Sequence, residues 1–176
     1  YRARLGGRGR YARKAVEWRK RVLLDFTAEQ VSGLRIDAGG AVVTELVRGP
    51  SLGVDDNGLP LPGPWELTPD PGYATDQLLA DSIVTSMGAM RAGEILGEDF
   101  DGGFSPPRAT LSFALATGDS RVLGVGSRAV EGGAFVRLQG EPDVYRVAAA
   151  TLAKAQATPA DLRDKTLFRF ARQQVD

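Results

Sequence analysis

The sequence of 176 residues contains no cysteine and no histidine. No disulfide can form, and a zinc site of the usual Cys/His type is excluded. The most frequent general base is missing too, so acid–base catalysis near neutral pH would need Asp, Glu, Lys, Tyr or Ser residues in shifted protonation states. Such shifts require a buried, charge-coupled site. We therefore expect no catalytic residues, no cofactor and no catalytic metal, and interpret the protein as a non-enzyme.

Long apolar runs and a net charge are also missing. No run approaches the ~20 residues that span a bilayer, and 22 basic residues balance 22 acidic ones. The charge is unevenly spread, because residues 1–21 hold nine Lys and Arg residues against Glu17 alone, a net charge of +8 that leaves −8 on the remainder. We interpret residues 1–21 as a basic N-terminal arm or helix, with Arg10, Arg13 and Lys14 as candidate interaction residues.

Apolar alternation and tight turns predict antiparallel strands that form a meander. Gly39-Gly40 is typical of a two-residue hairpin turn. Strands are more numerous than helices, which predicts an α+β fold built from two sheet segments with a helix between them. The strands expected from the pattern are 22–26, 34–36, 41–47, 65–68, 110–116, 121–125, 134–138 and 144–147.

One main amphipathic helix and several short ones are expected. Thr75 or Asp76 opens the main helix, which runs to about Met90 and carries the apolar stripe Leu79, Ile83, Met87 and Met90. Thr27 with Gln30 forms a capping box. A further helix is expected over 148–155, and Thr158 caps another that has Pro159 at its first position.

The segment 48–64 is rich in proline and glycine, so we expect a long loop there. Trp65 follows it directly. Aromatic anchors often carry interface energy. The pattern therefore makes Trp65 and the 48–64 loop a candidate interaction surface.

Two motifs admit a chemical interpretation. Gly124–Ala129 fits the dinucleotide fingerprint G-x-G-x-x-A, but the fingerprint works only where a helix begins, and here another strand is expected, so we interpret it as a turn. Asp55–Gly58 and Glu98–Gly102 resemble pieces of calcium loops without the terminal bidentate Glu, and we interpret them as turns as well. A hydrolase that uses Asp99 or Asp101 remains an alternative, because paired carboxylates catalyse glycoside hydrolysis.

A segment near the end of the chain resembles one near its beginning. Residues 22–31 and 166–175 coincide at four positions with an offset of 144 residues, which are Leu23/Leu167, Phe26/Phe170, Gln30/Gln174 and Val31/Val175. Such self-similarity is typical of repeated units. We therefore expect an arm at 1–21, an α+β module at 22–165, and at 166–176 the start of a second repeat module or a terminal strand.

Several short segments of the sequence occur in an order that is typical of a known family. They are Val22–Phe26, Ala28–Val31, Leu34–Ile36, Trp65–Pro69, Pro106–Thr110, Val122–Gly126, Ala134–Arg137, Val144–Val147 and Asp161–Lys165. Over about residues 22–176 the chain resembles the domain-of-unknown-function family numbered 4340. Phe104–Pro106 and the insert 50–63 depart from the family's pattern. The family has no accepted catalytic residues to carry over.

The resemblance implies a bacterial, envelope-associated protein of repeated modules on the extracytoplasmic (periplasmic) side, held by a membrane anchor outside this chain. Some members are auxiliary to ABC-type transport systems, including those linked to gliding motility. The leading hypothesis is a non-catalytic interaction or scaffold module with membrane-protein partners and no nucleic-acid partner. The alternatives are a carboxylate-based hydrolase, and an anionic-polymer binder that uses the basic arm to hold nucleic acid or lipid headgroups.

Overall fold

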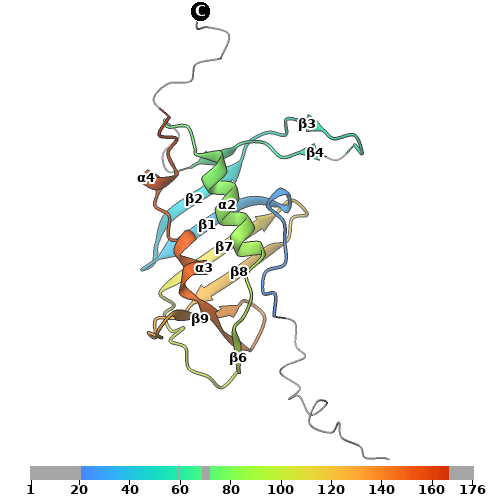
Figure 1. The fold of residues 1–176 in the computed structure, drawn as a ribbon. Coiled ribbons are helices and arrows are strands. Elements are labelled where there is room, and N and C mark those ends of the chain that lie inside the picture. Colours follow the sequence, from blue (N-terminus) through green and yellow to red (C-terminus); the bar gives the residue numbers. More distant parts are fainter. Residues whose placement is uncertain (1–20, 59, 69–71, 167–176) are drawn as a thin grey trace, which may run out of the picture.

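The fold is seen in a computed structural model that describes residues 21–58, 60–68 and 72–166. One antiparallel sheet of eight strands forms its framework, and helices cover one face of that sheet (Figure 1). The strands, in their spatial order, are β5 (Trp65–Leu67), β2 (Ala41–Arg48), β1 (Val31–Ala38), β7 (Ala109–Leu115), β8 (Ser120–Val125), β9 (Gly133–Leu138), β10 (Val144–Ala148) and β6 (Glu94–Gly97).

The α+β class is confirmed, but the expectation of two sheet segments separated by a helix is wrong. Strand β1 pairs with β2 on one side and with β7 on the other, and this joins the first hairpin to the later meander in one sheet. Leu34, for example, lies opposite Leu46 of β2 and Phe113 of β7. Alternation predicts which residues form strands, whereas a pairing between residues some 80 positions apart has no local signal.

The predicted hairpin turn is confirmed. Gly39 and Gly40 adopt φ values of 59° and 81°, and a turn with two positive φ angles matches the twist of the flanking strands. Beyond β2 the chain forms a second, isolated hairpin of β3 (Gly53–Val54) and β4 (Pro60–Leu61). The segment 48–64 was expected to be a loop throughout, so this small ladder corrects the prediction.

The main helix, α2 (Gln77–Gly88), is confirmed close to its expected bounds. The Asp76 side chain accepts a hydrogen bond from the Leu79 backbone N–H at 3.0 Å and caps the helix. Ile83 and Met87 are buried within the same apolar cluster as Phe113 of the sheet. The other helices are the 3₁₀ turn η2 (Ala28–Gln30), α3 (Ala149–Lys154) and α4 (Pro159–Leu162).

The segment 22–26 was expected to be a strand, but it does not form one. Val22 forms a single bridge to Arg91, and the φ of 54° at Asp25 interrupts the extended backbone. Leu23 and Phe26 are nevertheless buried, so the apolar spacing that resembled a strand belongs to a segment that packs against the end of α2. Strand β6 was not expected, because its sequence, Glu-Ile-Leu-Gly, is too short to show a period.

The sheet face away from the helices is partly covered by the segment 98–108. Phe100 lies 4.8 Å from Phe135, measured between ring centroids, and the Arg137 guanidinium lies 4.6 Å above the ring of Phe104. Elsewhere this face carries the Arg35–Asp37 pair of β1, joined at 3.0 Å, and the exposed Val42 and Val47 of β2. None of the helices in the described residues has the length and apolar character needed to cross a membrane.

Candidate interaction surface

A cluster of Arg48, the buried Trp65 and the half-exposed Asp81 fixes the point from which the β3–β4 hairpin leaves the sheet. One carboxylate oxygen of Asp81 accepts hydrogen bonds from the Trp65 indole N–H and from Nη2 of Arg48, both at 2.8 Å. The Arg48 guanidinium lies 3.9 Å above the Trp65 ring, and its Nη1 donates to the Gly63 carbonyl at 3.0 Å. These contacts tie β2, β5 and α2 together at the base of the hairpin.

The structure buries Trp65, whereas the prediction of Trp65 as an interaction residue requires an exposed side chain. Its side chain is only 1% exposed. A tryptophan next to a proline-rich segment resembles a surface anchor in sequence, but here the indole fills the core and donates its N–H to Asp81. The other predicted interaction residues, Arg10, Arg13 and Lys14, lie outside the described residues.

Residues 49–64, which we call the projecting arm, extend away from the body of the molecule (Figure 1). The arm closes at its root, where the Gly49 N–H donates to the Pro64 carbonyl at 2.8 Å. Gly63 approaches the opposite backbone so closely that an added Cβ would lie 2.2 Å from the Gly49 carbonyl oxygen. Backbone contact of this kind requires glycine, which is the physical reason for one of the arm's glycines.

The arm carries three exposed apolar side chains. Leu52 is 74% exposed, Val54 64% and Leu61 42%. Within the arm, the Leu52 N–H donates to the Leu61 carbonyl at 3.2 Å, and the Ser51 hydroxyl donates to the same carbonyl at 2.7 Å. The backbone is thus held in a hairpin while its apolar side chains face water.

A groove of about 520 Å³ lies beside the root of the arm, along the outer edge of β5. The Gln77 side chain bridges this edge, because its Oε1 accepts from the Trp65 N–H and its Nε2 donates to the Trp65 carbonyl. Tyr73 lines the groove and is 56% exposed, with the Arg163 guanidinium 4.1 Å from its ring. Val47 adds a further exposed apolar side chain.

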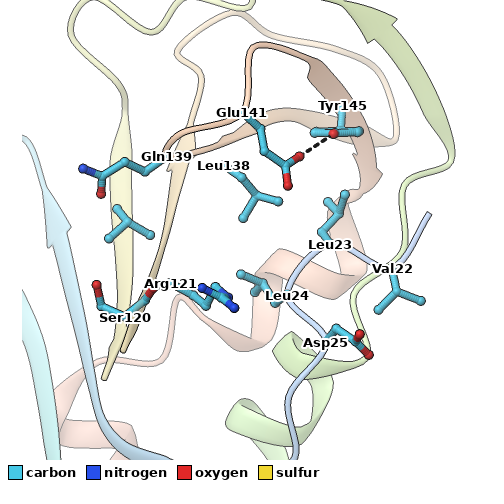
Figure 2. A pocket seen from close by; sticks show the side chains of 11 residues that line it. Val22, Leu23, Leu24, Asp25, Ser120, Arg121, Leu138, Gln139, Glu141 and Tyr145 are labelled. Carbon is cyan, nitrogen blue, oxygen red and sulfur yellow. Dashed lines mark hydrogen bonds between the residues drawn. The ribbon is translucent and has the colours of Figure 1, made fainter. Parts of the chain in front are cut away.

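Another cavity, of about 760 Å³, lies between the entering segment 22–25, the start of β8, the end of β9 and the start of β10 (Figure 2). Its lining combines Leu23 and Leu24 with Arg121 and Glu141. The Glu141 carboxylate accepts a hydrogen bond from the Tyr145 hydroxyl at 2.6 Å. The other polar residues that line this cavity are Asp25, Ser120 and Gln139.

The family model for DUF4340, a domain of unknown function, matches residues 65–176. The chain belongs to the DUF4340 family. The match begins at Trp65, so it includes β5, α2 and every later element, while the projecting arm and the β1–β2 hairpin precede it. No curated protein and no solved structure matches the chain. The family description gives no activity, so the function has to be argued from the site.

In this DUF4340 chain the segment Gly124–Ala129 is a strand end followed by a turn. β8 ends at Val125, and the next regular element is β9. An added Cβ at Gly126 would lie 2.1 Å from the Gly102 carbonyl oxygen, so this glycine is needed for packing against the segment 98–108. The helix that a dinucleotide fingerprint requires at this point is not formed.

The candidate carboxylates are divided between two places. Asp99 lines a groove of about 500 Å³ with Glu98 and Asp143. Asp101 instead accepts a hydrogen bond from the Gly103 N–H at 2.9 Å, and its side chain lies 4.0 Å from Arg128. Asp55 accepts from the Asn57 N–H at 2.8 Å, as in an ordinary turn. No group of three acidic residues in the described part of the chain is placed to hold a metal ion.

Proposed function

We propose that this chain is a non-catalytic interaction module of a membrane-anchored bacterial envelope protein. It works on the extracytoplasmic side, as an auxiliary of an ABC-type transport system, and contacts a membrane-protein partner through the projecting arm 49–64. Membership of the DUF4340 family supports the proposal, since the family has no accepted catalytic residues. The lack of histidine and cysteine supports it as well.

The observation that carries the proposal is that an arm with a fixed root exposes apolar side chains along its two sides. A hairpin held only by its own short ladder would gain nothing in folding from Leu52 and Val54, which are 74% and 64% exposed. Exposed apolar groups gathered on one element mark contact surfaces in soluble domains. The Arg48–Asp81–Trp65 cluster fixes the direction of the arm and so lowers the entropy lost when it binds.

We further propose that the module is one of a tandem series. Phe26 is buried, its ring lies 4.9 Å from that of Phe113, and the Asp25 N–H beside it donates to the Gly88 carbonyl. By the 144-residue offset, Phe170 is the matching residue of the next module, and it lies outside the described residues. A protein extended beyond residue 176 should bury Phe170 against the end of a second helix equivalent to α2.

The contact proposal is tested by site-specific photo-crosslinking in cells that express the whole protein. A photoreactive phenylalanine analogue is placed at Leu52, and at Ala116 as an exposed control on the body. We expect the Leu52 probe to give an adduct with a transmembrane subunit of an ABC-type transporter and the Ala116 probe to give none. Equal labelling from both sites, or an adduct only with cytoplasmic proteins, contradicts the proposal.

The claim that the module is non-catalytic needs a separate measurement. The purified protein is titrated with nucleotides, divalent metals and glycan or peptide substrates. We expect neither turnover nor saturable micromolar binding. Turnover that disappears in Asp99→Asn or Asp101→Asn would establish the hydrolase alternative instead.

A further inference from the structure

A further cavity, of about 310 Å³, lies between the sheet and the end of α3. Four of its lining residues belong to the buried core, since Ile36, Leu111, Val125 and Leu152 are each no more than 6% exposed. Protein interiors are closely packed, and voids larger than a water molecule are few. An apolar space of this size that reaches into the core therefore needs an explanation.

Small side chains leave this space open. The strand registers place Ala109 of β7 opposite Ala38 of β1 on one side and opposite Val125 of β8 on the other. Ala155 and Ala157, which follow α3, line the cavity from the helical layer. Methyl groups from the sheet and from the helical layer thus face the same space, and neither layer has a side chain long enough to fill it.

The walls of the cavity are held in place by a buried hydrogen bond. The hydroxyl of Thr44, which is fully buried in β2, donates to the Ala157 carbonyl at 3.1 Å and ties the segment after α3 to the sheet. The β1–β2 register shifts beside Thr44, and the extra residue of this bulge is Val43, which lines the cavity and is 38% exposed. Because its walls are fixed before binding, the cavity loses little entropy when a ligand enters.

Arg108 is the only charged residue among the described residues that line the cavity. It is exposed, and its backbone N–H donates to the Val125 carbonyl at 2.8 Å. Its guanidinium forms no ion pair or hydrogen bond with any described residue. A guanidinium presents two parallel N–H donors that match the two oxygens of a carboxylate. The site therefore combines an apolar interior with one available group that binds anions.

We propose that this cavity binds a free, single-chain aliphatic carboxylate. The hydrocarbon chain lies among the alanines, and the carboxylate pairs with Arg108. Apolar cavities of this kind exclude water and take up apolar ligands. The volume of about 310 Å³ is near the lower limit for ligand sites, which favours one short chain over the two chains of a phospholipid.

Titration calorimetry of the complete 176-residue chain with decanoate, kept below its micelle concentration, tests the proposal. We expect one saturable site. Arg108→Gln should raise the dissociation constant for decanoate by about tenfold, because a charge-assisted hydrogen bond is lost. Decanol has the same chain without the charge and should bind equally to the wild type and to Arg108→Gln. Arg91→Gln, at an exposed arginine outside the cavity, is the matched control and should leave the affinity for decanoate unchanged.

A second pair of variants tests the space itself. Ala109→Leu places a larger side chain in the cavity and should weaken decanoate and decanol alike by about tenfold or more, because both lose buried contacts. Ala114→Leu makes the same change at an exposed position of β7 and should bind both as the wild type does. Thermal unfolding shows whether the variants are folded. If Ala109→Leu is not, Val43→Trp at the opening is compared with Val42→Trp, which lies outside the cavity.

Several results would overturn the proposal. One is a lack of saturation with decanoate in the wild type, and another is an equal effect of Arg108→Gln and Arg91→Gln, or of the filling variant and its control. Binding to phosphatidylglycerol vesicles without binding of free decanoate would assign the cavity to a membrane lipid instead. Dimer formation that the filling variant abolishes, again without binding of decanoate, would assign it to a second copy of the chain.

Discussion

The side-chain amide of Gln77 forms with Trp65 both hydrogen bonds that a neighbouring strand would otherwise provide. Oε1 accepts from the Trp65 N–H at 2.7 Å, and Nε2 donates to the Trp65 carbonyl at 2.9 Å. One helix residue thereby closes part of the β5 edge and links the start of α2 to the root of the projecting arm. The relationship supports the view that the arm has a fixed base.

Gln77→Ala should remove both side-chain hydrogen bonds to the Trp65 backbone. We expect a loss of about 1–3 kcal/mol in the free energy of unfolding, because two partly buried backbone groups lose their partners. Urea unfolding of the purified chain measures the change. Gln156→Ala, at an exposed position, is the matched control and should stay within about 0.5 kcal/mol of the wild type. Equal effects of the two substitutions would show that the bridge does not stabilise the edge.

Asp81→Ala should destabilise the protein through Arg48. The Arg48 side chain is only 12% exposed, its Nε has no hydrogen-bond partner in the described part of the chain, and Asp81 supplies its counter-charge. Asp81 is itself 45% exposed, so solvent screening limits the loss to about 1–3 kcal/mol. Asp37→Ala breaks an exposed pair with Arg35 and should cost no more than about 1 kcal/mol. A larger loss in Asp37→Ala would contradict this ranking.

Ile83→Asp should unfold the domain. Ile83 is 1% exposed at the centre of the buried face of α2, and an unpaired charge there costs several kcal/mol, a large part of a typical domain's stability. Leu78→Asp also replaces an aliphatic side chain by a carboxylate, five residues earlier in the same helix, where the side chain is 84% exposed. Circular dichroism should show cooperative unfolding for Leu78→Asp and none for Ile83→Asp. A folded, cooperative Ile83→Asp protein would disprove the assignment of the core face.

Much of this local structure can be predicted from the sequence, because the signals are local. Gly39 and Gly40 form a turn with positive φ angles, Asp76 caps a helix with an apolar stripe, and Thr158 caps a helix that has Pro159 at its first position. The single sheet cannot be predicted in this way. It depends on the pairing of β1 with β7, which no short pattern contains.

The candidate site was predicted only in part. The sequence made Trp65 and the 48–64 loop a candidate interaction surface, and the contact role of the projecting arm stays a prediction. Trp65 was taken as the contact residue, but its burial depends on Asp81 and Arg48, which are distant in sequence and had no signal. In the sequence, the exposed residues Leu52 and Val54 look like ordinary loop residues. What distinguishes them in the structure is that they belong to an arm whose root is fixed by Arg48, Trp65 and Asp81.

The cap of α4 gives a prediction on acid stability. Hydrogen bonds from Thr158 lower the pKa of Asp161 below its usual 3.8. Because the folded state favours the ionised carboxylate, this contribution is present above pH 3.8 and is lost as the pH falls through the lowered folded pKa. Thr158→Ala should therefore lower the unfolding midpoint in urea at neutral pH, and the difference from wild type should narrow toward the acid side of 3.8. A difference that widens in acid would contradict the assignment.

The central claim, that the projecting arm is the contact surface, is tested most directly by the double variant Leu52→Asp/Val54→Asp. Its affinity for the partner cross-linked at Leu52 is compared with that of the wild type, alongside thermal unfolding of both proteins. Both residues are exposed, so we expect an unchanged unfolding midpoint. The dissociation constant should rise by about thirtyfold or more, as for the loss of a binding hot spot. An unchanged affinity in the folded double variant would contradict the account.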